Sequence, residues 1–251
     1  MSSSIWMQCA GDSRKQQLAV SAWRVIEAQH HVATRKLVDS AAEQELLEEL
    51  IERSKPPATE TTSLHYLLTT PFRYPPLRHG SRFGSRYETG IWYGAAHVRT
   101  VMAEIAYYRF VFLEGTSANL GTLTAQLTAF TVALKSSEAI DLTAEPFAQH
   151  ADAISSPTEY SASQALGAAM RAGGVEFCRY GSARDPHGGS NFAVFSTSAF
   201  GRARPRAFET WQLVSTPKSV ELFKHDYFER VLYQFPRETF LVGGWLPAPA
   251  V

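Results

Sequence analysis

Four side chains within residues 71–104 could act together on one ligand: Arg73, Arg82, Tyr93 and Glu104. A guanidinium group binds phosphate through two parallel hydrogen bonds, and a tyrosine ring can stack on a flat heterocycle. A carboxylate can stabilise the positive charge that develops on a sugar ring. This combination suits a phosphate-bearing nucleotide whose glycosidic bond is to be broken.

Each of these residues also has a purely structural interpretation. Arginine is common on protein surfaces, so Arg73 and Arg82 could pair with nearby carboxylates or hold their own loop together. Tyr93 could be a core strand residue with a satisfied hydroxyl, and its spacing alone favours that role. Glu104 could be a helix-edge glutamate in solvent, paired with Arg109 or a nearby histidine. Judged alone, Glu104 favours this structural interpretation.

Two further polar groups occur later in the chain. Ser161 and Gln164 are three residues apart, hence on one face of a helix, where they could bind an amide or a ribose. A serine at a helix start is also an ordinary cap. Ser182, Arg184 and Asn191 lie in and after a glycine-rich loop, whose backbone N–H groups could bind an anion. The alternative is a hairpin-like connection in which the glycines only turn the chain.

Composition excludes several classes of function. Lysine plus arginine equals aspartate plus glutamate, 24 each, which argues against direct nucleic-acid binding. Cys9 and Cys178 form no disulfide framework, and no run approaches the roughly 20 apolar residues of a membrane helix. The N-terminus lacks a secretory pattern, and the histidines lack metal-site spacing. We expect a soluble cytoplasmic protein without a bound metal. P-loop and Gly-x-Ser-x-Gly patterns are also absent from the sequence.

The N-terminal quarter of the chain carries a helical pattern. Apolar residues recur at spacings of about three and four, which predicts helix over residues 13–53. Lys55-Pro56-Pro57 ends it, because proline cannot donate a helical hydrogen bond. We therefore divide the chain into an N-terminal helical arm, residues 1–57, and a body, residues 58–251.

The body is predicted to mix strands and helices. Residues 73–90 are rich in Pro, Gly, Arg and Tyr and predict a long ordered loop, which is more often functional than filler. Helices are expected at 97–110 and 155–172, and a polar helical piece near His225. Strands are expected at 64–72, 90–94, 125–134, 175–180, 191–196, 208–215 and 219–224.

The motifs, taken in order, resemble the RES domain family, which comprises toxins of bacterial toxin–antitoxin pairs. The similarity extends from about Leu64 to Phe200, and residues 23–57 look like the arm of a longer proteobacterial branch. The matching motifs are Phe72-Arg73-Tyr74, Gly80-Ser81-Arg82-Phe83, Ile91-Trp92-Tyr93, Ala103-Glu104, Ser161 with Gln164, and Ser182-Ala183-Arg184-Asp185-Pro186 followed by Asn191.

The resemblance implies an α+β fold like that of ADP-ribosyltransferases, with a mixed sheet split around an NAD cleft. It also implies a helix-turn-helix (Xre/MbcA/ParS-like) antitoxin that binds over the cleft. Either Arg73 or Arg82 can match the arginine for which the family is named, and either Ser161 or Ser182 the serine. The implied catalytic residues are Arg73, Arg82, Tyr93, Glu104 and Ser182, and the implied substrate-binding residues are Tyr74, Ser161, Gln164, Arg184 and Asn191.

The function predicted from this resemblance is cleavage of NAD+ at the nicotinamide–ribose bond, with inorganic phosphate as the expected co-substrate and no bound prosthetic group. Water as the acceptor is an alternative. A second hypothesis is transfer of ADP-ribose to a macromolecule, and a third is a non-catalytic binding module. Self-association of the chain stays open.

Overall fold

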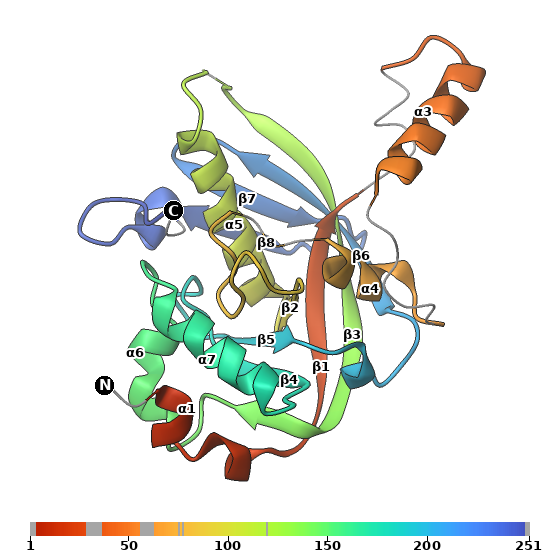
Figure 1. Cartoon of the computed structure of the whole chain (residues 1–251). Coiled ribbons are helices and arrows are strands. Elements are labelled where there is room, and N and C mark those ends of the chain that lie inside the picture. The colour runs from red at the N-terminus through yellow and green to blue at the C-terminus, as the bar shows by residue number, and fades with distance from the viewer. Residues whose placement is uncertain are drawn as a thin grey trace.

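The computed structural model describes residues 4–28, 37–55, 63–74, 76, 78–118 and 120–248. Within these residues the fold is α+β, with helices around one mixed sheet of eight strands, as predicted (Figure 1). The strands are β1 (Gln16–Glu27), β2 (Trp92–Ala95), β3 (Leu123–Asp141), β4 (Phe177–Gly181), β5 (Ser190–Val194), β6 (Arg206–Ser215), β7 (Ser219–Lys224) and β8 (Leu232–Pro236). The helices are α1 (Ile5–Gln8), α3 (Ala41–Ser54), α4 (Tyr66–Arg73), α5 (Val98–Glu114), α6 (Ala151–Ile154) and α7 (Ser161–Ala172).

Five of the strands form a closed ring of pairings. β1 pairs with β2, β2 with β5, β5 with β4, β4 with β3, and β3 pairs back with β1. β6, β7 and β8 extend the sheet from β3 as antiparallel neighbours. The pairing of β3 with β4 is parallel. β1 meets β2 at a single register pair, Trp23 with Ala95, so the ring is only loosely closed there.

β1 is the main departure from the expected elements. The predicted helix is wrong for residues 16–27, which pair with β3 from Gln16 opposite Ala139 to Glu27 opposite Leu127. From Ala22 to Ile26, alternate side chains of β1 enter two different cores, so both faces are apolar there and the two-residue period of a strand is masked, whereas in the first half the exposed Gln17, Ala19 and Ser21 alternate with Leu18 and Val20. One face contributes Leu18, Val20, Ala22 and Ile26, and the other contributes Trp23 and Val25.

The helical prediction is confirmed at α3, which projects from the body in Figure 1. The boundary drawn at residue 57 separates β1 from the sheet to which it belongs. Residues 29–36 and 56–57, also assigned to the arm, lie outside the described residues.

Two more expected elements differ. The strand predicted at 64–72 is wrong, because residues 66–73 form helix α4, whose first turn is capped by the His65 ring accepting the N–H of Leu67. The helical piece near His225 is also wrong, since the chain there turns into β8. The remaining expected strands and helices are present, the strand at 219–224 with the predicted bounds and the others with at least one shifted end. In particular, the helix predicted at 155–172 begins at Ser161.

α5 and α7 form the two sides of the region that holds the site. α5 buries Met102, Ala106 and Phe110 in a core shared with β6, β7 and β8. α7 buries Leu166 and Met170 in a second core shared with β4. The loop that follows α4 lies between these helices (Figure 1), and it packs so tightly on α7 that a side chain at Gly167 would clash with the backbone of Phe83.

Candidate active site

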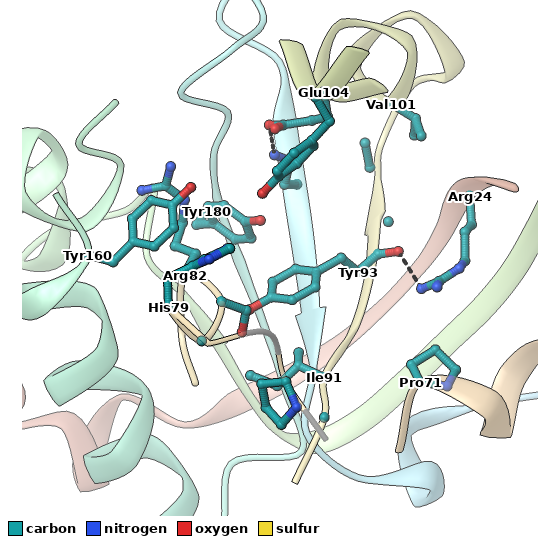
Figure 2. A pocket seen from close by; sticks show the side chains of 18 of the residues that line it. Arg24, Pro71, His79, Arg82, Ile91, Tyr93, Val101, Glu104, Tyr160 and Tyr180 are labelled. Carbon is teal, nitrogen blue, oxygen red and sulfur yellow. Dashed lines mark hydrogen bonds between the residues drawn. The ribbon is translucent and has the colours of Figure 1, made fainter. Parts of the chain in front are cut away.

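A cleft of about 480 Å³ lies between α5, β2 and the segment that leads into α7 (Figure 2). Glu104 is the one acidic residue among its described lining residues, and Arg24 and Arg82 enter from opposite sides. Five tyrosines contribute to its walls: Tyr74, Tyr93, Tyr108, Tyr160 and Tyr180. Such a cleft suits a ligand with flat rings and anionic groups.

Glu104 is held by two hydrogen bonds to the same oxygen. The half-buried side chain projects from α5, and its Oε1 accepts from Ser182 Oγ at 2.7 Å and from Asn191 Nδ2 at 2.7 Å. Ser182 Oγ itself accepts from the backbone N–H of Arg184 and of Asp185, so its single proton is directed at Glu104. The carboxylate is thus fixed in orientation, and no hydrogen bond from the described residues reaches Oε2.

Asn191, in β5, is buried, and its two amide atoms differ in what they contact. Nδ2 donates to Glu104, whereas the buried Oδ1 has no hydrogen-bond partner in the described part of the chain. A buried acceptor without a partner costs about 1–3 kcal/mol. Because Asn191 lines the cleft, a ligand hydroxyl or amide N–H could supply the missing donor.

The loop that carries Ser182 is pinned to the start of α5. The Asp185 carboxylate accepts from Thr100 Oγ1 at 2.8 Å, from the Arg99 guanidinium and from the N–H of His187. Burial raises the pKa of Asp185, but these three hydrogen bonds outweigh burial and lower the pKa below its ordinary value. These contacts of the Asp185 carboxylate hold the loop in place, so that Ser182 stays within hydrogen-bond distance of Glu104. We call them the Asp185 pin.

Tyr93, in β2, is a rigid part of the wall. Its hydroxyl donates to Ser81 Oγ at 2.9 Å and accepts the N–H of Phe83 at 3.1 Å. Burial raises the pKa of Tyr93 to about 12, so the phenol stays neutral. Gln164 supports the same loop from α7, because its Nε2 donates to the carbonyls of His79 and Ser81. Gln164 therefore buttresses the wall rather than facing the ligand.

Arg82 and Arg184 both hold the segment that precedes α7. Arg82 is buried, donates to the carbonyls of Ile154 and Ser156, and lies over the Tyr160 ring at 4.8 Å. Arg184 donates to the carbonyl of Pro157 and is not a lining residue of the cleft. Arg82 thus combines a structural anchor with a position in the cleft wall.

Residues 57–215 match the family model of the RES domain. The chain belongs to the RES domain family. Among solved structures, this RES protein is similar to a chain of the crystal structure of the M. tuberculosis MbcT–MbcA toxin–antitoxin complex, at 14% sequence identity and a TM-score of 0.47, over 85% of this chain and 92% of that chain. The search of curated proteins found no match to this chain. None of the described helices is long and apolar enough to cross a membrane.

Arg24 is a site residue that the sequence prediction missed, and it lies outside the segment that matches the RES model. It projects from β1, donates from Nη1 to the carbonyl of Tyr93 at 3.0 Å, and lies over the Trp92 ring at 5.2 Å. Burial lowers the pKa of Arg24 to about 10, which still leaves a cation at neutral pH. The signal that could have found it is a charge at an alternate position between Ala22 and Ile26 on an apolar strand face.

Five predicted residues are not among the described residues that line the RES cleft: Arg73, Ser161, Gln164, Ser182 and Arg184. Arg73, the last residue of α4, lines a separate, adjoining cavity and is not among the described residues that line the cleft with Glu104. The prediction that Arg73 shares the cleft with Glu104 is therefore wrong. Ser161 is exposed, and its hydroxyl donates to Glu159 at the start of α7 instead of lining the cleft.

His79, the histidine among the described lining residues of the RES cleft, adds no charge to it. Burial lowers the pKa of His79, so its imidazole is uncharged at neutral pH and can hydrogen-bond without adding charge. Among the described residues, no group of three or more His, Cys, Asp or Glu side chains could hold a metal ion. Arg109, one partner considered for Glu104, instead pairs with Glu27.

Proposed function

We propose that this RES protein degrades NAD+ by breaking the bond between nicotinamide and ribose, with inorganic phosphate as acceptor. The observation that carries the proposal is Glu104, fixed by Ser182 and Asn191 as the acid of a cleft that two guanidinium groups enter. Membership of the RES family supports an enzyme that consumes NAD+.

The proposed chemistry follows from the charge on the substrate. When the ribose C1–N bond breaks, its electron pair passes to the pyridinium nitrogen, so nicotinamide leaves neutral and the ribose becomes cationic. Glu104 stabilises that cation, because its carboxylate is already oriented by two donors before the substrate reacts. A phosphate oxygen then bonds to C1, which gives ADP-ribose-1″-phosphate.

The other cleft residues would bind and orient the substrate. Arg24 and Arg82 offer guanidinium groups to the diphosphate, and Tyr93 offers a ring to the nicotinamide. The unpartnered Oδ1 of Asn191 would accept from a ribose hydroxyl or from the nicotinamide amide, since either donor would satisfy the buried oxygen.

RES membership also supports the broader class, a toxin of a toxin–antitoxin system. We propose a helix-turn-helix antitoxin as its partner. Bound over the cleft, such a protein would block access of NAD+ to Glu104.

The test is to incubate the purified protein with NAD+ and phosphate and to identify the products by mass spectrometry. We expect nicotinamide and ADP-ribose-1″-phosphate. Glu104→Gln should lower the rate about 100- to 1,000-fold, the usual loss for one preorganised electrostatic contact. Glu114→Gln is the matched control, because Glu114 belongs to the same helix but does not line the cleft.

Each contrary result has a separate meaning. If Glu104→Gln releases nicotinamide as fast as the unaltered protein, the role given to Glu104 is wrong. Free ADP-ribose formed in the presence of phosphate would make water the acceptor. ADP-ribose attached to a protein would make the enzyme a transferase.

A further inference from the structure

Helix α3 carries an apolar stripe that the body of the protein does not cover. Leu46 and Leu50 are four residues apart, hence on one face of the helix, and Leu47 and Ile51 repeat this spacing beside them. Leu46, Leu50 and Ile51 are exposed, and Leu47 is half-buried. α3 projects from the body in Figure 1, and none of its described side chains is buried. The described part of the chain thus leaves this stripe open to solvent.

The same helix is strongly acidic. Its sequence holds five glutamates and one arginine. Glu49 is exposed and follows Leu46 by three residues, so it flanks the apolar stripe, whereas the exposed Glu45 lies on the opposite face of the helix. An amphipathic helix with acidic flanks fits a surface that combines apolar side chains with basic ones.

A surface of that kind begins just before β6. Arg202, Arg204 and Arg206 alternate along the chain and are all exposed. No carboxylate in the described part of the chain pairs with any of the three. Phe208, two residues further on, is 58% exposed. This segment therefore offers three cations and an aromatic ring to a partner.

The loop between β7 and β8 adds two more aromatic rings. The side chains of Tyr227 and Phe228 are fully exposed, and Arg230 is exposed without an ionic partner among the described residues. The loop lies next to the start of β6, because the N–H of His225 donates to the carbonyl of Thr210 at 2.8 Å. Neighbouring exposed aromatic rings and arginines are typical of protein–protein interfaces.

This loop is also held in one conformation. Lys224 contacts the carboxylates of Glu209 and Glu229, each at 3.1 Å, and that of Asp226 at 3.5 Å. Asp226 in turn accepts the N–H of Phe228 at 2.9 Å. Aromatic rings that are fixed before a partner arrives lose little entropy on binding. We call the following set the basic aromatic face: Arg202, Arg204, Arg206, Phe208, Tyr227, Phe228 and Arg230.

The two open surfaces lie on the same side of the molecule. The carbonyl of Ala203 accepts the N–H of His65 at 2.8 Å, so the arginine segment runs beside the residue that precedes α4. α3 projects from this side of the body (Figure 1). A two-fold axis on this side would bring each α3 to the basic aromatic face of a second copy.

We propose that two copies of this chain form a dimer in which α3 of each copy packs on the basic aromatic face of the other. The apolar stripe covers the three exposed rings, and the glutamates of α3 face the arginines. A nucleic acid could neutralise the arginines but would repel α3, whereas a second copy satisfies both surfaces at once. The inference is independent of the proposed reaction, because neither surface lines the cleft.

The first test is the mass of the purified protein in solution. Sedimentation equilibrium at micromolar concentration should give the mass of two chains. In the variant Leu46→Ala/Leu50→Ala, the dissociation constant of the dimer should rise at least tenfold, because apolar contact is lost in both copies. Alanine favours helix at least as well as leucine, so circular dichroism should be unchanged. A monomer at every concentration, or a variant that dimerises like the unaltered protein, would overturn the inference.

The second test exchanges charges between the two surfaces. Glu49→Lys and Arg204→Glu should each raise the dissociation constant at least tenfold, since each places like charges together in both contacts of the dimer. An equimolar mixture of the two variants should dimerise within about threefold of the unaltered protein. In that mixed dimer the new lysine faces the new glutamate, and the other contact keeps its native residues.

Two matched controls reverse a charge elsewhere. Glu45→Lys changes the opposite face of α3, and Arg14→Glu changes an exposed arginine in the turn Gly11–Arg14, remote in the fold from β6. Both should dimerise like the unaltered protein. A mixture of Glu49→Lys and Arg204→Glu that stays monomeric would overturn the inference. Rescue only when both substitutions are in one chain, with the mass of a monomer, would mean that α3 packs on its own body. Binding of single-stranded RNA that Arg204→Glu abolishes, without a dimer, would make the face a nucleic-acid site instead.

Discussion

The two ends of the site are built differently. At the carboxylate end, Glu104 receives two hydrogen bonds from side chains that are themselves held by a pinned loop. At the cationic end, Arg24 rests on a ring and one carbonyl, without a carboxylate partner among the described residues. At the first end the Glu104 carboxylate is oriented before a ligand arrives, and only the Oδ1 of Asn191 still lacks a donor. At the second end Arg24 has no anionic partner among the described residues until a ligand binds.

This contrast separates two tasks. Fixed donors that need not reorganise lower the barrier of a chemical step, so the carboxylate end is suited to catalysis. A cation without a carboxylate partner among the described residues, as Arg24 is, gains most of its stabilisation when an anionic ligand binds, so this end is suited to recognition. We therefore expect substitutions at the carboxylate end to change kcat and substitutions at the cationic end to change KM.

After Glu104 itself, the largest effect should come from the two donors to its carboxylate. Ser182→Ala and Asn191→Ala each remove one hydrogen bond to a charged group, worth about 1.5–3 kcal/mol, so kcat should fall roughly 10- to 100-fold in each. Because both bonds reach the same oxygen, the double variant should lose less than the product of the two losses. Steady-state kinetics of the four proteins in this cycle measure the coupling.

Ser161→Ala is the control for that cycle, since Ser161 is exposed and contacts Glu159. It should retain full activity. Strictly multiplicative losses for Ser182 and Asn191, or losses confined to KM, would mean that the two residues do not orient Glu104 for the chemical step.

The Asp185 pin, which supports the loop of Ser182, should contribute to the free energy of unfolding. Asp185→Asn removes the charge that binds Arg99 and Thr100, and should lower the free energy of unfolding by about 2 kcal/mol at neutral pH. The folded-state pKa of Asp185 lies below the ordinary 3.8, so its contribution is present above 3.8 and is lost as the pH falls through the folded-state pKa. Urea unfolding at several pH values should show the two proteins converging in acid. A constant difference would contradict the Asp185 pin.

At the cationic end, Arg24→Met should raise the KM for NAD+ about tenfold while kcat changes little, because the substitution removes a phosphate contact but keeps the packing on Trp92. Arg24→Lys keeps the charge without the forked geometry, and should lie between Met and the native residue. Kinetics of the three proteins give the comparison. A fall in kcat with unchanged KM would place Arg24 among the groups that act in the chemical step.

Much of the carboxylate end could be predicted from sequence. Glu104, Ser182 and Asn191 occur in short motifs, and each motif lies on one element whose type the local pattern gives correctly. What the sequence could not give is that Ser182 and Asn191 meet on one oxygen of Glu104. That meeting depends on the pairing of β5 with β2 and on the Asp185 pin, both of which join distant segments.

The cationic end was largely missed, for a physical reason. Arg24 lies in the second half of β1, where both faces of the strand carry apolar residues and the alternation of apolar and polar residues is lost. Its apolar residues therefore also fit the three- and four-residue spacing of a helix. Arg73 was misplaced because a short apolar segment does not distinguish strand from helix, and Arg73 ends helix α4 in the lining of the adjoining cavity.

The smallest expected effect tests the wall between the two ends. Tyr93→Phe keeps the ring but leaves the N–H of Phe83 without its acceptor, which should lower the free energy of unfolding by about 1 kcal/mol and change kcat by less than about twofold. Urea unfolding and steady-state kinetics measure the two effects separately. A large loss of kcat would mean that the Tyr93 hydroxyl takes part in the reaction instead of having only a structural role.

The same variant carries a distinct pH signature. Burial raises the pKa of Tyr93 from 10.0 to about 12, so the folded state holds the phenolic proton more tightly than the unfolded state does. The resulting stabilisation is present below pH 10.0 and is lost as the pH rises toward about 12. The phenylalanine variant has no such proton. The stability difference between the two proteins should therefore shrink from neutral to alkaline pH, whereas a constant difference would mean that the hydroxyl is not buried beside Ser81.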